Sequence, residues 1–198
     1  IREVMPVCTG KDDTLQSMYP MKYAEDQGAV KFDFLGLQNL STIDNSLELI
    51  NKNNNEPSNL DISRIPMDDR LTFDLFCRAD TVGVFQLESA GMRKYIKDLK
   101  PSNISDIAAM IALYRPGPME HIDRFIRSKY GKEKIKYPHE ALKEILSETY
   151  GIIVYQDQVL KIAQAFGGYT VGEADILRKA MGKKIKEVMQ AQKDTFIK

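Results

Sequence analysis

The sequence predicts an α+β fold that is predominantly helical, and two observations carry this prediction. A short apolar run at residues 28–37, bounded by glycines and interrupted by two charges, is typical of a strand with polar residues on one face. From residue 61 onward, apolar residues recur at helical spacing, and Pro and Gly residues, which end helices, separate the segments.

The composition is that of a globular protein. The 198 residues, 43% hydrophobic and 28% charged, suffice for one fair-sized core or two small ones. Residues 1–120 hold 13 basic and 18 acidic side chains, whereas residues 121–198 hold 15 and 10, so a polyanion is expected to meet the C-terminal part. Cys8 and Cys77 fit no disulfide or zinc-site spacing, which favours a reducing, cytoplasmic setting. No apolar run approaches the roughly 18 residues of a membrane helix, so we expect no membrane association.

The first elements in chain order are the strand at 28–37 and a helix at 40–50. Ser41 or Thr42 is the expected N-cap of this helix. The polar segment at 51–59 is expected to be a loop and is the best internal boundary in the chain.

The rest of the chain is expected to be helical. The predicted helices are 69–78, 89–99, 102–114, 120–129, 139–149, 156–165 and 170–181. Ser102 is the expected cap of the third, while Thr170 and Glu173 stand at capping-box spacing at the start of the last. Gly182 is expected to end that last helix.

Lys31 and Asp33 share one face of the predicted strand. An exposed ion pair of little energetic value is the commoner arrangement for such residues. If the apolar neighbours Phe32, Phe34 and Leu35 bury the strand, however, the carboxylate is costly unless it binds a metal or a cation. One carboxylate is not enough for phosphoryl transfer by two metal ions.

Four cations lie close together near the C-terminus: Arg178, Lys179, Lys183 and Lys184. A solvated basic face is the usual explanation for such a cluster. The density of the cluster favours a functional role in binding phosphate groups, because an Arg binds a phosphate with two hydrogen bonds and a Lys acts as a point charge. The cluster suits a triphosphate or a DNA backbone.

Five motifs together resemble the DnaE-type alpha subunit of bacterial DNA polymerase III. They are KFDFLGL at 31–37, GVFQLESAGMR at 83–93, ALYRPGPM at 112–119, YGIIVYQDQVLKIAQ at 150–164 and GEADILRKAMGKK at 172–184. Their order and spacing match as well. The resemblance implies an internal piece of such a subunit, with residues 1–38 as the C-terminal end of a polymerase-beta-like palm and residues 39–198 as the first part of a helical fingers domain.

The resemblance also implies an activity, the template-directed addition of dNMP to a primer 3′ end by two-metal-ion transfer with Mg²⁺. By analogy, Asp33 is a catalytic aspartate and Mg²⁺ ligand, and Lys31 is a neighbour of the substrate phosphates or the primer end. Arg178 and Lys179 contact the triphosphate of the incoming nucleotide. The other two aspartates of the family belong to a PDxDxDF-type motif that this sequence lacks, so the chain alone is expected to be inactive.

Further implied contacts are weaker candidates. Gln86, Ser89 and Arg115 are expected to line the nucleotide pocket, and Lys183 and Lys184 to contact DNA. The implied partners are primer-template DNA, dNTP and, in the intact protein, the sliding clamp and clamp loader of the replisome at the nucleoid. The competing hypothesis is a noncatalytic helical module that binds nucleic acid or another protein, which would not need Asp33 beside Lys31 on an apolar strand.

Overall fold

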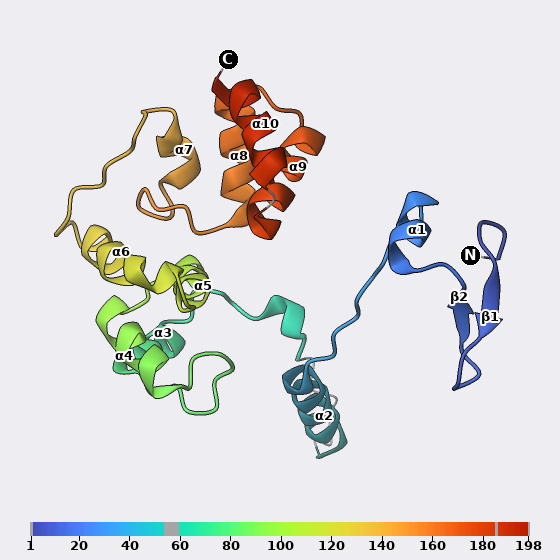
Figure 1. Ribbon diagram of the computed structural model, residues 1–198. Helices are drawn as coiled ribbons and strands as arrows, with labels where there is room; N and C mark the ends of the chain where they lie inside the picture. Colours follow the sequence, from blue (N-terminus) through green and yellow to red (C-terminus); the bar gives the residue numbers. More distant parts are fainter. Residues whose placement is uncertain (1, 54–59, 185, 198) are drawn as a thin grey trace. The chain divides into compact units, whose positions relative to one another are not determined.

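The structure, a computed structural model, describes residues 2–53, 60–184 and 186–197 (Figure 1). The chain divides into two compact units, Ile1–Leu60 and Asp61–Lys198. Most of the described regular structure is helix, and the described strands form one two-stranded sheet. A predominantly helical fold with a small sheet is thus confirmed. In the described segments, every helix is too short or too polar to cross a membrane.

The first unit begins with a hairpin that the sequence analysis did not predict. Its elements are β1 (Val7–Thr9), β2 (Leu15–Ser17), α1 (Met21–Asp26) and α2 (Gln38–Asn53). The strands pair antiparallel, with Cys8 opposite Gln16. Helix α2 confirms the predicted helix but begins earlier, so neither Ser41 nor Thr42 is its cap. The Thr42 hydroxyl instead donates to the Gln38 carbonyl at 3.2 Å from inside the helix.

The predicted strand at 28–37 is wrong. Residues 29–37 lead into α2 without regular structure, and their large apolar side chains lie in solvent, with 72% of Phe32, 94% of Phe34 and 89% of Leu35 exposed. A strand needs a neighbouring strand to bond its backbone N–H and C=O groups. Within the described ranges, β1 and β2 bond only each other, so this segment has no sheet to join.

The second unit is helical throughout its described regular structure. Its helices are η1 (Ile62–Arg64), α3 (Arg70–Arg78), α4 (Ala90–Leu99), α5 (Ile104–Leu113), η2 (Pro118–His121), α6 (Ile122–Lys129), α7 (Leu142–Leu146), α8 (Gln156–Gly167), α9 (Val171–Lys183) and α10 (Lys186–Ile197). Each helix predicted between residues 69 and 181 is present, with shifted ends. The largest difference is α7, which is much shorter than the predicted 139–149.

Two predicted helix ends are wrong. Ser102 does not cap α5, because the side chain of Asn103 accepts the Asp106 N–H at 2.8 Å, and Ser102 instead donates to the Asp106 carboxylate. Gly182 does not end α9, which continues to its C-cap, Lys184, a residue with φ of 53°. A glycine inside a helix weakens it, but the preceding capping box and packing offset that cost.

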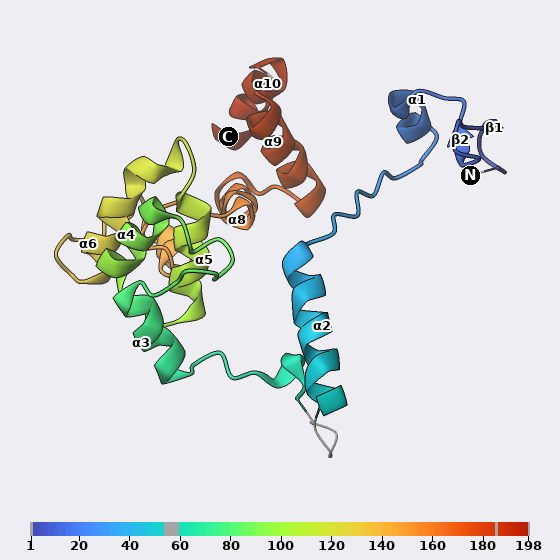
Figure 2. The same ribbon diagram turned by 90° about the horizontal axis from the view of Figure 1, so that it is seen from below.

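The second unit has two apolar cores. The larger core joins α4, α5 and α6 through fully buried side chains such as Ile96, Met110 and Phe125. The smaller one lies where α8 meets α9, around Ala163 and Ala174. Helices α8, α9 and α10 lie side by side, as Figures 1 and 2 both show. This packing fixes α9, which carries the basic cluster.

Candidate functional site

A capping box sets the start of α9. The Glu173 carboxylate accepts the Thr170 N–H at 2.8 Å, and the Thr170 hydroxyl accepts the Glu173 N–H at 3.3 Å. Hydrogen bonds from the Thr170 backbone and hydroxyl lower the pKa of Glu173 below its ordinary value. The predicted capping box is therefore confirmed, and it fixes the residue at which α9 begins.

Asp175 lies between the two predicted phosphate-binding residues. Its Oδ1 accepts from Arg178 Nε at 2.9 Å and Nη2 at 2.7 Å, and its Oδ2 lies 2.9 Å from the Lys179 ammonium. The hydrogen bonds from Lys179 and Arg178 lower the pKa of Asp175. The carboxylate therefore stays ionised at neutral pH, and the three side chains together carry one positive charge.

The guanidinium of Arg178 is also held by a second helix. Its Nη1 donates to the side-chain oxygen of Gln156, the first residue of α8, at 3.1 Å. A guanidinium has five N–H donors, and Asp175 and Gln156 together accept three, so two remain for a ligand. The side chain of Arg178 is 30% exposed and that of Lys179 is 61% exposed. Both cations are open to solvent, and Arg178 is held in one orientation.

Sequence reasoning did not single out Asp175 or Gln156. The acid lies three and four positions before the two cations, which is the spacing of helical ion pairs, so a signal for it was present in the sequence. Gln156 lies 22 positions from Arg178, and only the packing of α8 on α9 brings the two together. The rest of the cluster is less defined: Lys184 is exposed at the C-cap, and the side chain of Lys183 lies outside the described residues.

Lys31 and Asp33 form an ion pair at 3.2 Å, with side chains 56% and 66% exposed. The burial that would have made this carboxylate costly is absent, so the apolar-strand argument for a metal ligand fails here. Among the described residues, no three His, Cys, Asp or Glu side chains are grouped so as to hold a metal ion. Asp33 supplies at most one ligand, and the described residues do not fit a two-metal site.

The motifs that carry Gln86, Ser89 and Arg115 meet in the second unit. Ser89 caps α4 by accepting the Met92 N–H at 3.2 Å, while Gln86 and Arg115 are exposed. The first turn of α4 touches the end of α5, since a Cβ on Gly91 would overlap the Tyr114 hydroxyl. The structure therefore brings the two motifs together at one corner, and the role of these three residues in nucleotide binding remains a prediction.

Comparison with known proteins identifies the family. Residues 39–198 match the family described as the bacterial DNA polymerase III alpha subunit finger domain. The DNA polymerase III subunit alpha of Bacillus subtilis (strain 168) is 46% identical over 197 residues, which is 100% of this chain and 18% of that protein. The subunit of Escherichia coli (strain K12) is 52% identical over 182 residues, 87% of this chain and 16% of that protein. The chain thus spans less than a fifth of these relatives, and it belongs to the finger-domain family of the bacterial DNA polymerase III alpha subunit.

Proposed function

We propose that this chain is part of a replicative DNA-directed DNA polymerase, in which residues 1–38 end the palm and residues 39–198 form the first part of the fingers. The whole protein would add dNMP to a primer 3′ end on a template. The observation that carries the proposal is the cation pair on α9, held in place by Asp175 and Gln156 in a chain of this family.

In this proposal Arg178 binds the triphosphate of the incoming nucleotide. Its two remaining N–H donors suit two phosphate oxygens, and Lys179 adds a point charge beside them. Negative charge builds up on the leaving pyrophosphate, so fixed cations there stabilise the transition state. Asp175 and Gln156 prepare the guanidinium for this contact, because a side chain already held in place loses less entropy on binding.

The other predicted residues take secondary roles. Gln86, Ser89 and Arg115 would line the nucleotide pocket, and Lys183 and Lys184 would contact the DNA backbone. The proposed partners are primer-template DNA, dNTP, the sliding clamp and the clamp loader, at the replisome.

Asp33 would give one carboxylate to a Mg²⁺ site, with Lys31 near the substrate phosphates. The exposed ion pair is compatible with this role, since an accessible carboxylate is free to exchange its lysine partner for a metal ion. The remaining ligands would have to come from residues other than those described. We therefore assign Asp33 no step of the reaction beyond ligation.

The triphosphate role is tested with Arg178→Ala in the full-length protein. A lost charge-assisted contact of about 1.5–3 kcal/mol should lower kcat/KM for dNTP roughly 10- to 150-fold, with little change in primer-template affinity. Arg178→Lys keeps the charge and loses the paired N–H donors of the guanidinium. Its kcat/KM for dNTP should lie between those of Arg178→Ala and the wild type.

The matched control is Lys184→Ala, which removes an exposed cation beyond the end of α9 and should leave the dNTP KM unchanged. If the cluster binds DNA instead, Arg178→Ala will weaken DNA binding. The slope of log affinity against log salt concentration will then become shallower by about 0.9, the value for one lost phosphate contact. A normal kcat/KM for dNTP in Arg178→Ala refutes the triphosphate role.

A further inference from the structure

A row of lysines follows the end of α6. Lys132, Lys134 and Lys136 are exposed, whereas the residues between and after them, Glu133 and Ile135 among them, are half-buried. Exposure that alternates with a period of two places the three ammonium groups along one solvent-facing edge. We call Lys132, Lys134 and Lys136 the lysine stripe.

The backbone under the lysine stripe is anchored at both ends. The Lys132 N–H donates to the Arg127 carbonyl at 2.9 Å, and the Glu133 carboxylate pairs with the Arg127 guanidinium at 2.9 Å. At the other end, the Lys136 carbonyl lies 3.1 Å from the place that a Cβ on Gly151 would take. The backbone that carries the stripe is therefore held in place on the fold, and its ammonium groups are free to meet a partner.

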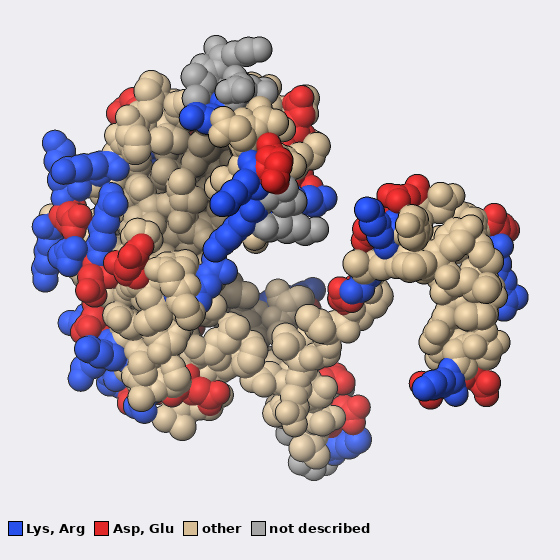
Figure 3. Space-filling view, in the orientation of Figure 1, with Lys and Arg blue, Asp and Glu red and all other residues tan. Residues whose placement is uncertain are grey.

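The lysine stripe adjoins a hollow of about 400 Å³ that is rich in cations. Lys132 lines this hollow together with Lys97 and Lys100 from the end of α4, and Asp98 is also present. The ring of Tyr130 forms part of the wall, with the Lys132 ammonium 6.0 Å from its centroid. Figure 3 shows Lys and Arg side chains gathered along this edge of the unit, over α6 and the segment that follows it.

Helix termini do not account for the lysine stripe. Lys97 and Arg127 lie in the last turns of α4 and α6, where the helix dipole favours a cation. The stripe lies beyond the end of α6, and in the part of the chain that the structure describes none of its lysines has an ion pair, since the nearest acid, Glu133, is occupied by arginines. Three unpaired like charges on a fixed edge fit an anionic partner that extends along them.

We infer that the lysine stripe binds the phosphate backbone of DNA at a site separate from the cation pair on α9, an inference that rests on the proposed function. The chain from Lys132 to Lys136 spans at most about 13 Å, which is about four nucleotide steps of 3.4 Å. Lysines act as point charges without a required orientation, so this contact is independent of DNA sequence and adds affinity.

The test uses the full-length protein carrying Lys132→Ala, Lys134→Ala and Lys136→Ala together. Primer-template affinity is measured across a salt series, on one DNA that is all duplex and on one with a single-stranded template overhang. On duplex, each lost contact lowers the salt slope by about 0.9, so three contacts lower it by about 2.7. Between 50 and 200 mM salt, the wild type should therefore lose about 40-fold more affinity than the variant. If the salt slope changes only on the DNA with the overhang, by about 0.7 for each lost contact, the lysine stripe binds single-stranded template.

The matched control removes three exposed lysines elsewhere, Lys22, Lys143 and Lys161, and should leave the slope unchanged. Melting temperature and dNTP KM should be normal in both variants, because the stripe side chains make no described hydrogen bond and Lys143 and Lys161 form only exposed ion pairs of little energetic value. An unchanged slope in the stripe variant, or an equal fall in the control, overturns the inference. If the wild-type protein neither binds nor extends primer-template, the proposed function fails and the inference fails with it. If the wild type does both and only the slope test fails, the inference alone is overturned.

Discussion

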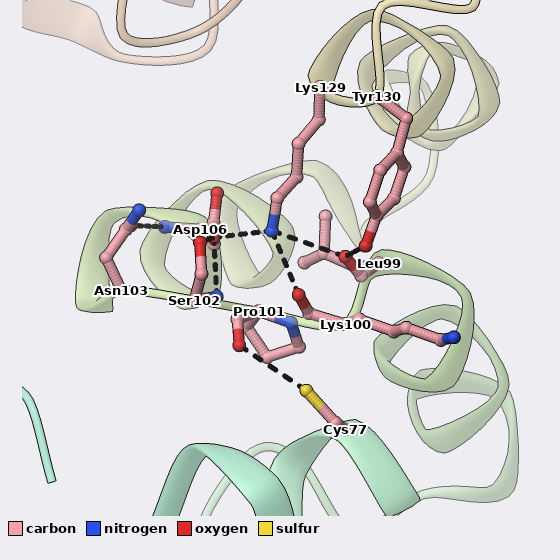
Figure 4. Close-up of polar contacts among 9 residues, drawn as sticks. All are labelled: Cys77, Leu99, Lys100, Pro101, Ser102, Asn103, Asp106, Lys129 and Tyr130. Carbon is pink, nitrogen blue, oxygen red and sulfur yellow. Dashed lines mark hydrogen bonds and ion pairs between the residues drawn. The ribbon is translucent and has the colours of Figure 1, made fainter. Parts of the chain in front are cut away.

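The connection from the end of α4 to the start of α5 is joined to α6 by a buried ion pair (Figure 4). Lys129 Nζ lies 2.7 Å from Asp106 Oδ2, and the two side chains are 10% and 4% exposed. The ammonium also donates to the carbonyls of Lys100 at 3.0 Å and Leu99 at 3.3 Å, so its three donors are all used. Asp106 in turn accepts the N–H and hydroxyl of Ser102 at 2.8 and 3.1 Å.

Lys129→Met keeps an unbranched apolar side chain that is one heavy atom shorter, and it removes the charge. Breaking a buried pair costs about 3–5 kcal/mol, because the remaining charge has lost its partner. Here the two Ser102 hydrogen bonds still support Asp106, and the Leu99 carbonyl keeps its bond from the Tyr130 hydroxyl at 2.8 Å. We therefore expect a loss at the lower end of that range, about 3 kcal/mol in the free energy of unfolding.

Urea denaturation of the chain measures this loss. Adding Asp106→Asn to Lys129→Met removes the unpaired charge and should recover about half of the loss, since the amide still accepts a bond from Ser102. The control is Lys161→Met, which breaks an exposed pair with Asp157 and should cost under about 0.5 kcal/mol. If Lys129→Met costs no more free energy of unfolding than this control, the buried pair does not stabilise the contact of α6 with the connection from α4 to α5.

Two further predictions concern single carboxylates. Asp33→Asn in the full-length protein should lower kcat by orders of magnitude while urea denaturation stays normal, because the side chain is 66% exposed; retained activity would show that Asp33 ligates no catalytic metal. The lowered pKa of Glu173 means that its stabilisation of α9 is complete above the ordinary carboxyl pKa and is lost as pH falls through the lower folded value. Circular dichroism should show a loss of helix over that acid range. This loss should be smaller in Glu173→Gln, whose side chain does not titrate. An acid titration identical to that of the wild type would contradict the capping role.

The helices could be predicted because their signals are local. Asp69, Ser89 and Thr170 each bond an N–H three residues ahead, so the cap and its target lie in the same short stretch of sequence. The exact end of a helix is less certain, as at α5, where Asn103 is the cap and its neighbour Ser102 bonds the Asp106 carboxylate. Sequence alone could not choose between two adjacent residues that are both good caps.

What depends on distant residues could not be predicted. The strand at 28–37 had a suitable pattern, but a strand forms only beside another strand. The pair of Lys129 and Asp106 joins residues 23 positions apart, and Gln156 reaches Arg178 across 22. The cations on α9 were therefore identified from the sequence, while the groups that orient them became known only from the structure.

The two basic regions of the second unit differ in how their charges are held. Asp175 accepts two N–H groups of Arg178 and offsets one of the two positive charges of Arg178 and Lys179, which lowers nonspecific attraction and fixes the guanidinium plane. That arrangement suits a compact ligand whose oxygens must meet a fixed fork. The lysines after α6 have fixed backbones, free ammonium groups and no described acid partner, which suits a long polyanion attracted by charge alone. The proposed polymerase would need both kinds of contact, because it would have to position one nucleotide accurately and hold DNA of any sequence.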